Sequence, residues 1–415
     1  MRFDLRTRTA DDVVDVDPGR FHEVDVPAHL VERGDLATRA FRASGLESIA
    51  IVVDGVAHTW RLDGDGVLET LPGDADARAR AEFSGEWFSD IVHDVRSTVA
   101  LVISEEVGMA RGSIVHLTAW EPVLRALIDG RPAYEPGLVD FIDRDGTPLD
   151  LHRSFTLGDD PGVLSHFLST AGFLHLRGVC TPVEMDALSA EIDRWREKMT
   201  PDDDRAWYAE VAGEQVCVRV TNLPADPTEF PHAARLGPIA DLTDAELRYG
   251  GTDLLVKPVG VDKGLSDLPW HKDCALGLHS YRCASLTCGV SVTESDADNG
   301  QFGVVAGSHR VNIALFDLDK KVDLPQVYLA TEPGDVTVHI SCALHCATPP
   351  RHAERRVTYS SLRLPGTAGD LDQKIRAVLG DEGVDHSVST FSRAEYAAAL
   401  SGPRSQALPP AAPRW

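Results

Sequence analysis

Two residues in the middle of the chain are of types that can hold a metal ion together. His271 and Asp273 are separated by Lys272 in the segment Leu-Pro-Trp-His-Lys-Asp at positions 268–273. Side chains alternate along a strand, so on a strand the imidazole and the carboxylate leave the same face. A neutral imidazole and a carboxylate placed in this way can grip one metal ion. Taken alone, such a pair is more typical of a protein surface without a metal ion. Further residues are therefore needed to predict a metal site.

His345 is the candidate for a third ligand. Two histidines and one carboxylate form the facial triad of non-haem Fe(II) oxygenases, which leaves three positions of the octahedron open. Eleven residues beyond His345 lies Arg356. Its planar guanidinium suits a carboxylate anion. The four residues together predict an iron site beside an anion-binding site.

Two neighbours of these residues leave alternatives open. Arg355 adjoins Arg356 and is a second candidate for the anion partner, since strand alternation lets only one of the two point inward. His339 precedes His345 on an apolar segment, and we interpret it as a packed core histidine rather than a fourth ligand.

The cysteines near the predicted ligands raise zinc as a rival metal. Cys274 adjoins Asp273, and Cys342 and Cys346 bracket His345. A second pair of cysteines at knuckle spacing is missing from the sequence, and on a strand Cys274 would point away from Asp273. Buried free cysteine is the more common state, so we favour iron over zinc.

With these residues in order, the second part of the chain resembles the phytanoyl-CoA dioxygenase family of Fe(II)/2-oxoglutarate-dependent oxygenases. The resemblance covers about residues 165–365. It rests on an ordered set of motifs: Gly172-Phe173, Lys257-Pro258, Trp270-His271-Lys272-Asp273, Asn299-Gly300, Gly307-Ser308-His309-Arg310, Gly334-Asp335, His339, His345 and Arg356. It implies a double-stranded β-helix, or jelly roll, with flanking helices.

The resemblance also implies roles for the site residues. His271, Asp273 and His345 would be the catalytic iron ligands, Arg356 would hold the distal carboxylate of 2-oxoglutarate, and O2 would be the oxidant. Many members of the family carry a serine shortly after the distal histidine, and here Thr348 is the candidate to supply that hydroxyl. Halogenating relatives replace the carboxylate ligand by a small residue, so the retained Asp273 favours hydroxylation, desaturation or oxidative ring closure.

The first part of the chain is similar to a sterol-carrier-protein-2-type domain over about residues 40–135. The motifs that carry this similarity are Ala81-Glu82-Phe83-Ser84, the segment Val99–Ile103, and Leu117-Thr118-Ala119-Trp120 with the stretch that follows to Pro132. The similarity implies a five-stranded sheet with helices around an apolar tunnel.

The elements of the first part follow from local patterns. Ser48–Val53 and Val56–Leu62 flank Asp-Gly, a strong hairpin signal. We predict further strands over Val99–Ile103 and Ser113–Thr118. Trp120–Ile128 has the apolar spacing of an amphipathic helix.

The second part begins with a helix signal and continues with strands. A short apolar strand around 172–179 precedes Thr181, a candidate N-cap for a helix that runs to about Lys198. Short segments separated by turns then predict strands of a sandwich or barrel. These are Leu254–Val261, Ser285–Val292, Gly303–Val305, Val327–Ala330, Asp335–Ile340 and Arg356–Leu364.

Composition and charge set limits on domains, partners and compartment. The 415 residues carry a net charge of −25, which disfavours nucleic-acid and anionic membrane partners. A cluster of Pro and Gly at 131–162 divides the chain into a smaller α+β domain, 1–145, and a mainly β domain, 146–401, with an extended tail at 402–415. The seven cysteines show no disulfide framework and the N-terminus shows no signal peptide, so we expect a cytoplasmic protein with reduced thiols.

These observations predict an iron- and 2-oxoglutarate-dependent dioxygenase that oxidises a C–H bond of a small, largely apolar molecule such as a secondary metabolite. The alternative is a non-catalytic carrier of apolar ligands built on the N-terminal domain. Neither the substrate nor the oligomeric state follows from the sequence, and a homodimer is compatible with it.

Overall fold

The computed structural model describes residues 13–74, 76–98, 101, 107–203, 205–223, 230–263, 268–273, 285–312 and 323–363. The predicted strand at 99–103, apart from Leu101, lies outside the described residues. So do Cys274 and the tail at 402–415. None of the helices in the described ranges combines the length and the apolar character needed to cross a bilayer.

The first part of the chain is a five-stranded sheet covered by helices. Its strand order is β3-β2-β1-β4-β5. The strands are β1 (Ser48–Val53), β2 (Val56–Leu62), β3 (Leu68–Pro72), β4 (Ala79–Phe83) and β5 (Gly108–Arg111), and the helices are α1 (Pro18–Arg20), η2 (Phe21–Asp25), α2 (Val26–Ser44), α3 (Gly85–Val92) and α5 (Ile114–Asp129). The predicted hairpin is confirmed as β1–β2. Asp54 and Gly55 both have positive φ in its two-residue turn, as a type I′ connection requires.

The prediction of a strand over Ser113–Thr118 is wrong. Ser113 is the N-cap of α5, in a capping box with His116, and the helix continues to Asp129. Gly130 ends the helix in the left-handed conformation, so the predicted helix over Trp120–Ile128 is confirmed as the second half of α5. The β-branched residues of the first turn imitate a strand, and the cap overrides that local preference.

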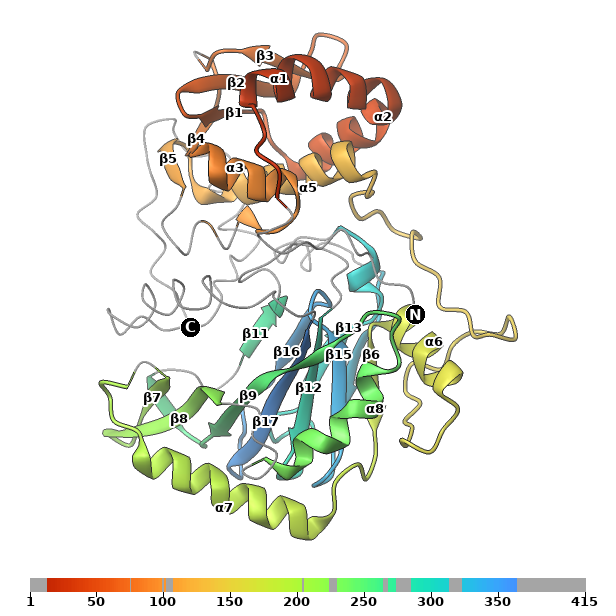
Figure 1. Cartoon of the computed structure of the whole chain (residues 1–415), viewed down its shortest axis with the longest axis vertical. Coiled ribbons are helices and arrows are strands. Elements are labelled where there is room, and N and C mark those ends of the chain that lie inside the picture. The colour runs from red at the N-terminus through yellow and green to blue at the C-terminus, as the bar shows by residue number, and fades with distance from the viewer. Residues whose placement is uncertain are drawn as a thin grey trace.

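Two antiparallel sheets form the second part, as predicted for a jelly roll (Figure 1). The larger has the order β10-β7-β8-β9-β17-β12-β15-β6 and the smaller β11-β16-β13-β14. The first sheet comprises β6 (Phe173–Leu176), β7 (Ala206–Val211), β8 (Glu214–Leu223), β9 (Arg248–Lys257), β10 (Val261–Lys263), β12 (Leu286–Ser291), β15 (Val336–Ile340) and β17 (Arg355–Arg363). The second comprises β11 (Leu268–His271), β13 (Phe302–Val305), β14 (Gln326–Leu329) and β16 (His345–Ala347).

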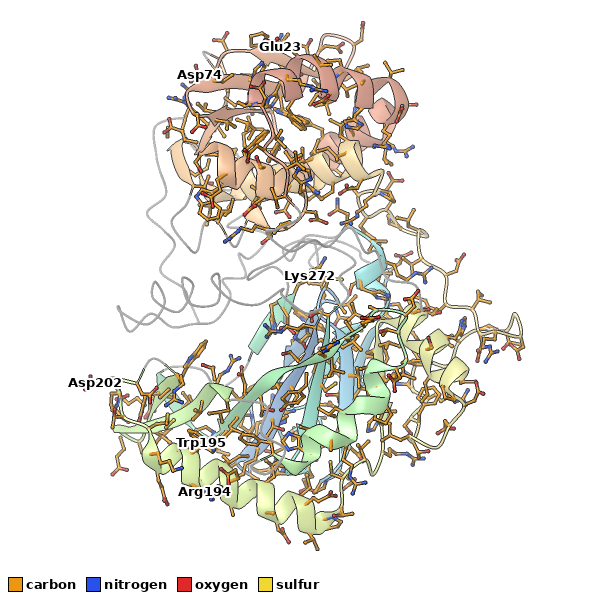
Figure 2. The ribbon with its side chains drawn as sticks, in the orientation of Figure 1. Glu23, Asp74, Arg194, Trp195, Asp202 and Lys272 are labelled. Carbon is orange, nitrogen blue, oxygen red and sulfur yellow. The ribbon has the colours of Figure 1, made fainter. Side chains whose placement is uncertain are left out.

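Helices flank the larger sheet, and the predicted helix is confirmed as α7 (Pro182–Lys198). Thr181 caps it in a capping box with Glu184, and Met185, Leu188 and Ile192 enter the core. Figure 2 shows Trp195 on the side of α7 that faces the sheet and Arg194 on the side turned away. The remaining helices of this part are α6 (Pro161–Ala171), η3 (Pro231–Leu236), α8 (Gly237–Ala240) and η5 (Ser308–Arg310).

Each part has its own buried core. One apolar cluster extends from Phe21 to Leu127 and another from Leu149 to Leu362, with no residue in common. Between them, the segment after α5 contacts the second part, where Ala133 forms a bridge with Asn312. The amide of Asn312 also donates to the carbonyl of Pro122 in α5, 3.0 Å away. The two parts therefore touch through specific polar contacts beside the chain that joins them.

Candidate metal centre

The structure brings His271, Asp273 and His345 together at one end of the smaller sheet. β11 ends at His271, β16 begins at His345, and the two residues are directly paired in the antiparallel register. Asp273 follows β11 after Lys272, which is labelled near that end of the sheets in Figure 2. The ligand atoms of the three residues all lie within 4.8 Å of one another. The ladder thus places residues that are 72 to 74 positions apart in the chain on one site.

The ring of His345 is oriented so that one nitrogen remains for a metal. Its Nδ1 lies 3.0 Å from the carbonyl of Ala343, which can only accept a hydrogen bond, so Nδ1 carries the proton. In the neutral form of the ring, Nε2 is then the nitrogen without a proton, and it lies 3.4 Å from Oδ1 of Asp273. Nε2 of His271 is 3.5 Å from the same oxygen. A backbone carbonyl on the outer nitrogen is the arrangement that fixes metal-binding imidazoles in proteins.

The carboxylate of Asp273 divides its two oxygens between different partners. Oδ1 faces the two histidines of the triad, while Oδ2 accepts hydrogen bonds from Oγ1 of Thr287 at 2.8 Å and Nε2 of His339 at 3.2 Å. Burial alone would raise the pKa of Asp273, but the charge of His345 and hydrogen bonds from the surrounding histidines outweigh it and hold the pKa well below the usual value. The carboxylate is therefore ionised at neutral pH and can ligate a cation.

His339 is fully buried on β15 and is not one of the three clustered ligands. Its ring packs against Phe302, with ring centroids 5.1 Å apart. Burial, together with the nearby His345, lowers the pKa of His339 to about 4, so the ring is neutral at physiological pH. It contacts the triad through Asp273.

The donor set fits a divalent transition metal. Two imidazole nitrogens and one carboxylate oxygen are the ligands of non-haem Fe(II) oxygenases, whereas Mg²⁺ and Ca²⁺ prefer oxygen alone. Within the described ranges this is the only grouping of its kind, and it includes no cysteine. Cys342 and Cys346 are buried and are not among the three clustered ligands. The thiolate zinc site considered from the sequence therefore finds no support among these residues.

Arg356, which was predicted to hold the distal carboxylate of the cosubstrate, has protein partners in the structure. Its guanidinium lies on the outer side of β17, where Nη1 donates to Asp193 at 2.8 Å and to Ser189 at 2.9 Å, both in α7. Nε donates to Glu354. The phase of β17 turns this side chain toward α7.

Arg355 takes the inward direction instead. In the β12–β17 ladder Thr287 pairs with Ser361, so alternate residues back to Arg355 share the face of Thr287. Arg355 is 2% exposed, and its Nε and Nη1 have no hydrogen-bond partner among the described residues. Its neighbour across the ladder is Lys257, also 2% exposed. Two buried cationic side chains thus lie side by side on the triad's face of the sheet.

Gly300 connects this cationic pair with the triad. A Cβ at Gly300 would lie 2.6 Å from Cδ of Arg355, so the arginine stem passes directly over the glycine backbone. Two residues further on, Phe302 packs against His345, with ring centroids 5.7 Å apart. One short stretch of chain therefore contacts both the stem of Arg355 and the ring of His345.

Thr348, which was predicted to supply a hydroxyl to the cosubstrate, contacts the backbone in the structure. Its hydroxyl donates to the carbonyl of Gln301 at 3.4 Å, and its amide donates to the same carbonyl. Sequence reasoning did not assign a role to Thr287 or Lys257. Lys257 had a signal in its Lys-Pro motif, whereas nothing in the local sequence marked Thr287.

Comparisons with known proteins agree with this site. Residues 168–357 match the family model described as phytanoyl-CoA dioxygenase (PhyH). No curated protein matches the chain.

Among solved structures, AviO1 from Streptomyces viridochromogenes is 21% identical, with a TM-score of 0.42, over 51% of this chain and 97% of that one. EctD from S. alaskensis is 19% identical, with a TM-score of 0.43, over 57% and 85%. The non-heme alpha ketoglutarate dependent carbocyclase SnoK from nogalamycin biosynthesis is 20% identical, with a TM-score of 0.37, over 51% and 87%. Likeness at this level does not bear on the substrate of this chain.

Proposed function

We propose that the chain is an Fe(II)/2-oxoglutarate-dependent dioxygenase that oxidises a C–H bond of a small, largely apolar molecule. The match of residues 168–357 to the phytanoyl-CoA dioxygenase family model supports this proposal. The observation that carries the proposal is the convergence of His271, Asp273 and His345. The side chain of Asp273 is 32% exposed while both histidines are buried, so small molecules can reach the open side of the triad.

The three ligands would hold Fe(II), which together with 2-oxoglutarate supplies the activation of dioxygen. The protein's own part is to present the unprotonated Nε2 of His345, the imidazole of His271 and one oxygen of Asp273 from a rigid sheet. Three coordination positions then remain for a bidentate cosubstrate and dioxygen. Asp273 occupies the position that a halide would need, which supports hydroxylation, desaturation or ring closure.

Arg355, with Lys257 beside it, is the residue that we propose for the distal carboxylate of 2-oxoglutarate. A guanidinium with unpartnered N–H groups needs an anion when it is buried, and its fork matches a carboxylate. The two positive charges suit a dianion. Arg356 and Thr348 are not part of this proposal, because both side chains have other partners.

We propose the substrate class from charge. A protein with a net charge of −25 repels phosphate-rich molecules, so a CoA thioester suits it less well than an uncharged molecule such as a secondary metabolite. The same charge disfavours nucleic acid as a partner. A cytoplasmic setting is part of the proposal, since Cys180, Cys217 and Cys288 are buried and form no disulfide.

For the N-terminal part we propose an auxiliary domain of about residues 1–145 beside an oxygenase domain of about 146–401. Its five strands agree with the number expected of a sterol-carrier-like fold. Its core is filled by large side chains such as Trp60, Trp120, Phe41 and Phe88. Such packing favours a role in orienting the enzyme or in assembling it as a homodimer over a role in carrying ligands.

The test is anaerobic titration of the metal-free protein with Fe(II) and then with 2-oxoglutarate. We expect a weak metal-to-ligand charge-transfer band in the visible spectrum. The band should be lost in Asp273→Ala and, at the same cosubstrate concentration, in Arg355→Ala. Arg356→Ala is the matched control and should keep it. Iron binding without a band would remove the cosubstrate assignment, and full turnover by Asp273→Ala would contradict the enzyme.

A further inference from the structure

We infer that Thr287 and His339 are positioning residues that hold one oxygen of Asp273 away from the metal. The inference rests on the proposed function, since it concerns how the carboxylate of that site is used. Both residues contact Oδ2, at 2.8 Å from Oγ1 of Thr287 and 3.2 Å from Nε2 of His339. Oδ1 is left to face His271 and His345.

The sheet explains why these two donors meet at one atom. Thr287 on β12 and His339 on β15 are directly paired in the antiparallel ladder. Directly paired residues point to the same face, with Cβ atoms about 5 Å apart. β12 lies between β17 and β15, and β15 lies between β12 and β6, so both donors come from strands that are paired on both edges. Asp273, which follows the end of β11, is the member of the contact that lies outside a strand.

The chemistry of the contact fixes the proton on His339. An ionised carboxylate only accepts hydrogen bonds, so Nε2 of His339 must donate. A nitrogen that carries a proton cannot ligate a metal at the same time. The other ring nitrogen, Nδ1, is buried and has no hydrogen-bond partner among the described residues. His339 therefore acts on the metal through Asp273 and is not a fourth ligand.

The contact has a consequence for the coordination sphere. A free carboxylate can bind a cation through one oxygen or through both. With Oδ2 engaged by two donors, Asp273 offers one oxygen, and the protein supplies three ligand atoms. Because a chelating cosubstrate and dioxygen together require three positions, the pair keeps available a position that a bidentate aspartate would occupy.

The experiment measures Co(II) binding to the full-length metal-free protein, by its visible d–d spectrum and by calorimetry, followed by titration of the Co(II) form with 2-oxoglutarate. The test variants are Thr287→Val and His339→Leu, which remove each donor at similar volume. We expect each to weaken Co(II) binding about 10- to 100-fold, the usual effect of losing a partner of a metal ligand. Thr287→Ser and His339→Gln retain a donor and should restore most of the affinity.

Thr337→Val is the matched control. Thr337 is on β15 two residues from His339, on the same face, and its hydroxyl donates to the carbonyl of Gly289 rather than to Asp273. It should bind Co(II) as the wild type does. Circular dichroism of each variant checks that the fold is retained, and the serine and glutamine variants separate loss of the donor from loss of packing.

Each remaining outcome decides a different point. Wild-type affinity in both Thr287→Val and His339→Leu would overturn the inference. A change of Co(II) coordination number in His339→Leu, with Thr287→Val unaffected, would make His339 a ligand and overturn it too. Failure of the wild type itself to bind Co(II) would instead remove the proposed function.

Discussion

At the scale of single residues, the role of each histidine at the site depends on which of its ring nitrogens is engaged by another protein group. Nδ1 of His345 donates a hydrogen bond to a backbone carbonyl, which leaves Nε2 for a metal. In His339 it is Nε2 that donates a hydrogen bond, to Asp273. The two histidines are of one type, are close in space and have neighbouring rings. Their different partners give one the role of ligand and the other that of support.

The reactivity of two buried cysteines can be predicted from the effect of burial on their pKa. Burial raises the pKa of Cys288 to about 12, and burial with the neighbouring Glu184 raises the pKa of Cys180 to about 11. Because the thiolate is the nucleophile, both should resist iodoacetamide at pH 8 in the native protein and react once it is unfolded in urea. Peptide mapping by mass spectrometry measures this. Rapid native labelling of Cys288 would show that its strand opens or that its thiol is ionised.

At the scale of elements, some features could be predicted from the local sequence, whereas others depend on how the strands pair in the sheet. The capping box at Thr181 defines the start of α7, and Asp54-Gly55 defines the β1–β2 turn, because each motif satisfies its own backbone geometry. The choice between Arg355 and Arg356 depends on the phase of a strand. A shift of one residue exchanges the two faces, and only pairing with β9 and β12 sets it. The triad could be predicted because His271, Asp273 and His345 stand in an ordered set of motifs along the chain, whereas Thr287 belongs to no such motif.

The start of α7 gives a test at this scale. Thr181→Ala removes the side chain that accepts from the amide of Glu184, and such caps contribute about 1 kcal/mol to the free energy of unfolding. We expect a loss of that size in urea unfolding. Val183→Ala in the same turn is the control, because Val183 is 77% exposed and should change stability little. Equal losses in the two variants would mean that the capping box does not stabilise the helix.

At the scale of the whole molecule, each of the two cores contains a histidine that burial keeps neutral. His22 packs beside Trp60 in the first part and His232 beside Phe230 in the second. Burial lowers the pKa of each to about 4. Unfolding exposes them to water, where their pKa returns to about 6.5. Both parts of the chain therefore carry the same source of acid sensitivity.

The sign of the effect follows from proton uptake. Between about pH 6.5 and pH 4 the unfolded chain binds protons that the folded chain does not, so stability falls as the pH falls through this range and is fully present above it. Each histidine should cost about 2 kcal/mol at pH 5 relative to pH 7.5.

Urea unfolding of His22→Leu and His232→Leu at both pH values isolates the effect, since groups that titrate in the opposite direction, such as the buried Glu121, are common to all the proteins. Each variant should lose about 2 kcal/mol less than the wild type between pH 7.5 and pH 5. His152→Leu, at an exposed position, should lose as much as the wild type. If both buried variants kept the full wild-type loss, acid sensitivity would have to come from other groups, and the two neutral histidines would not couple the stability of the cores to pH.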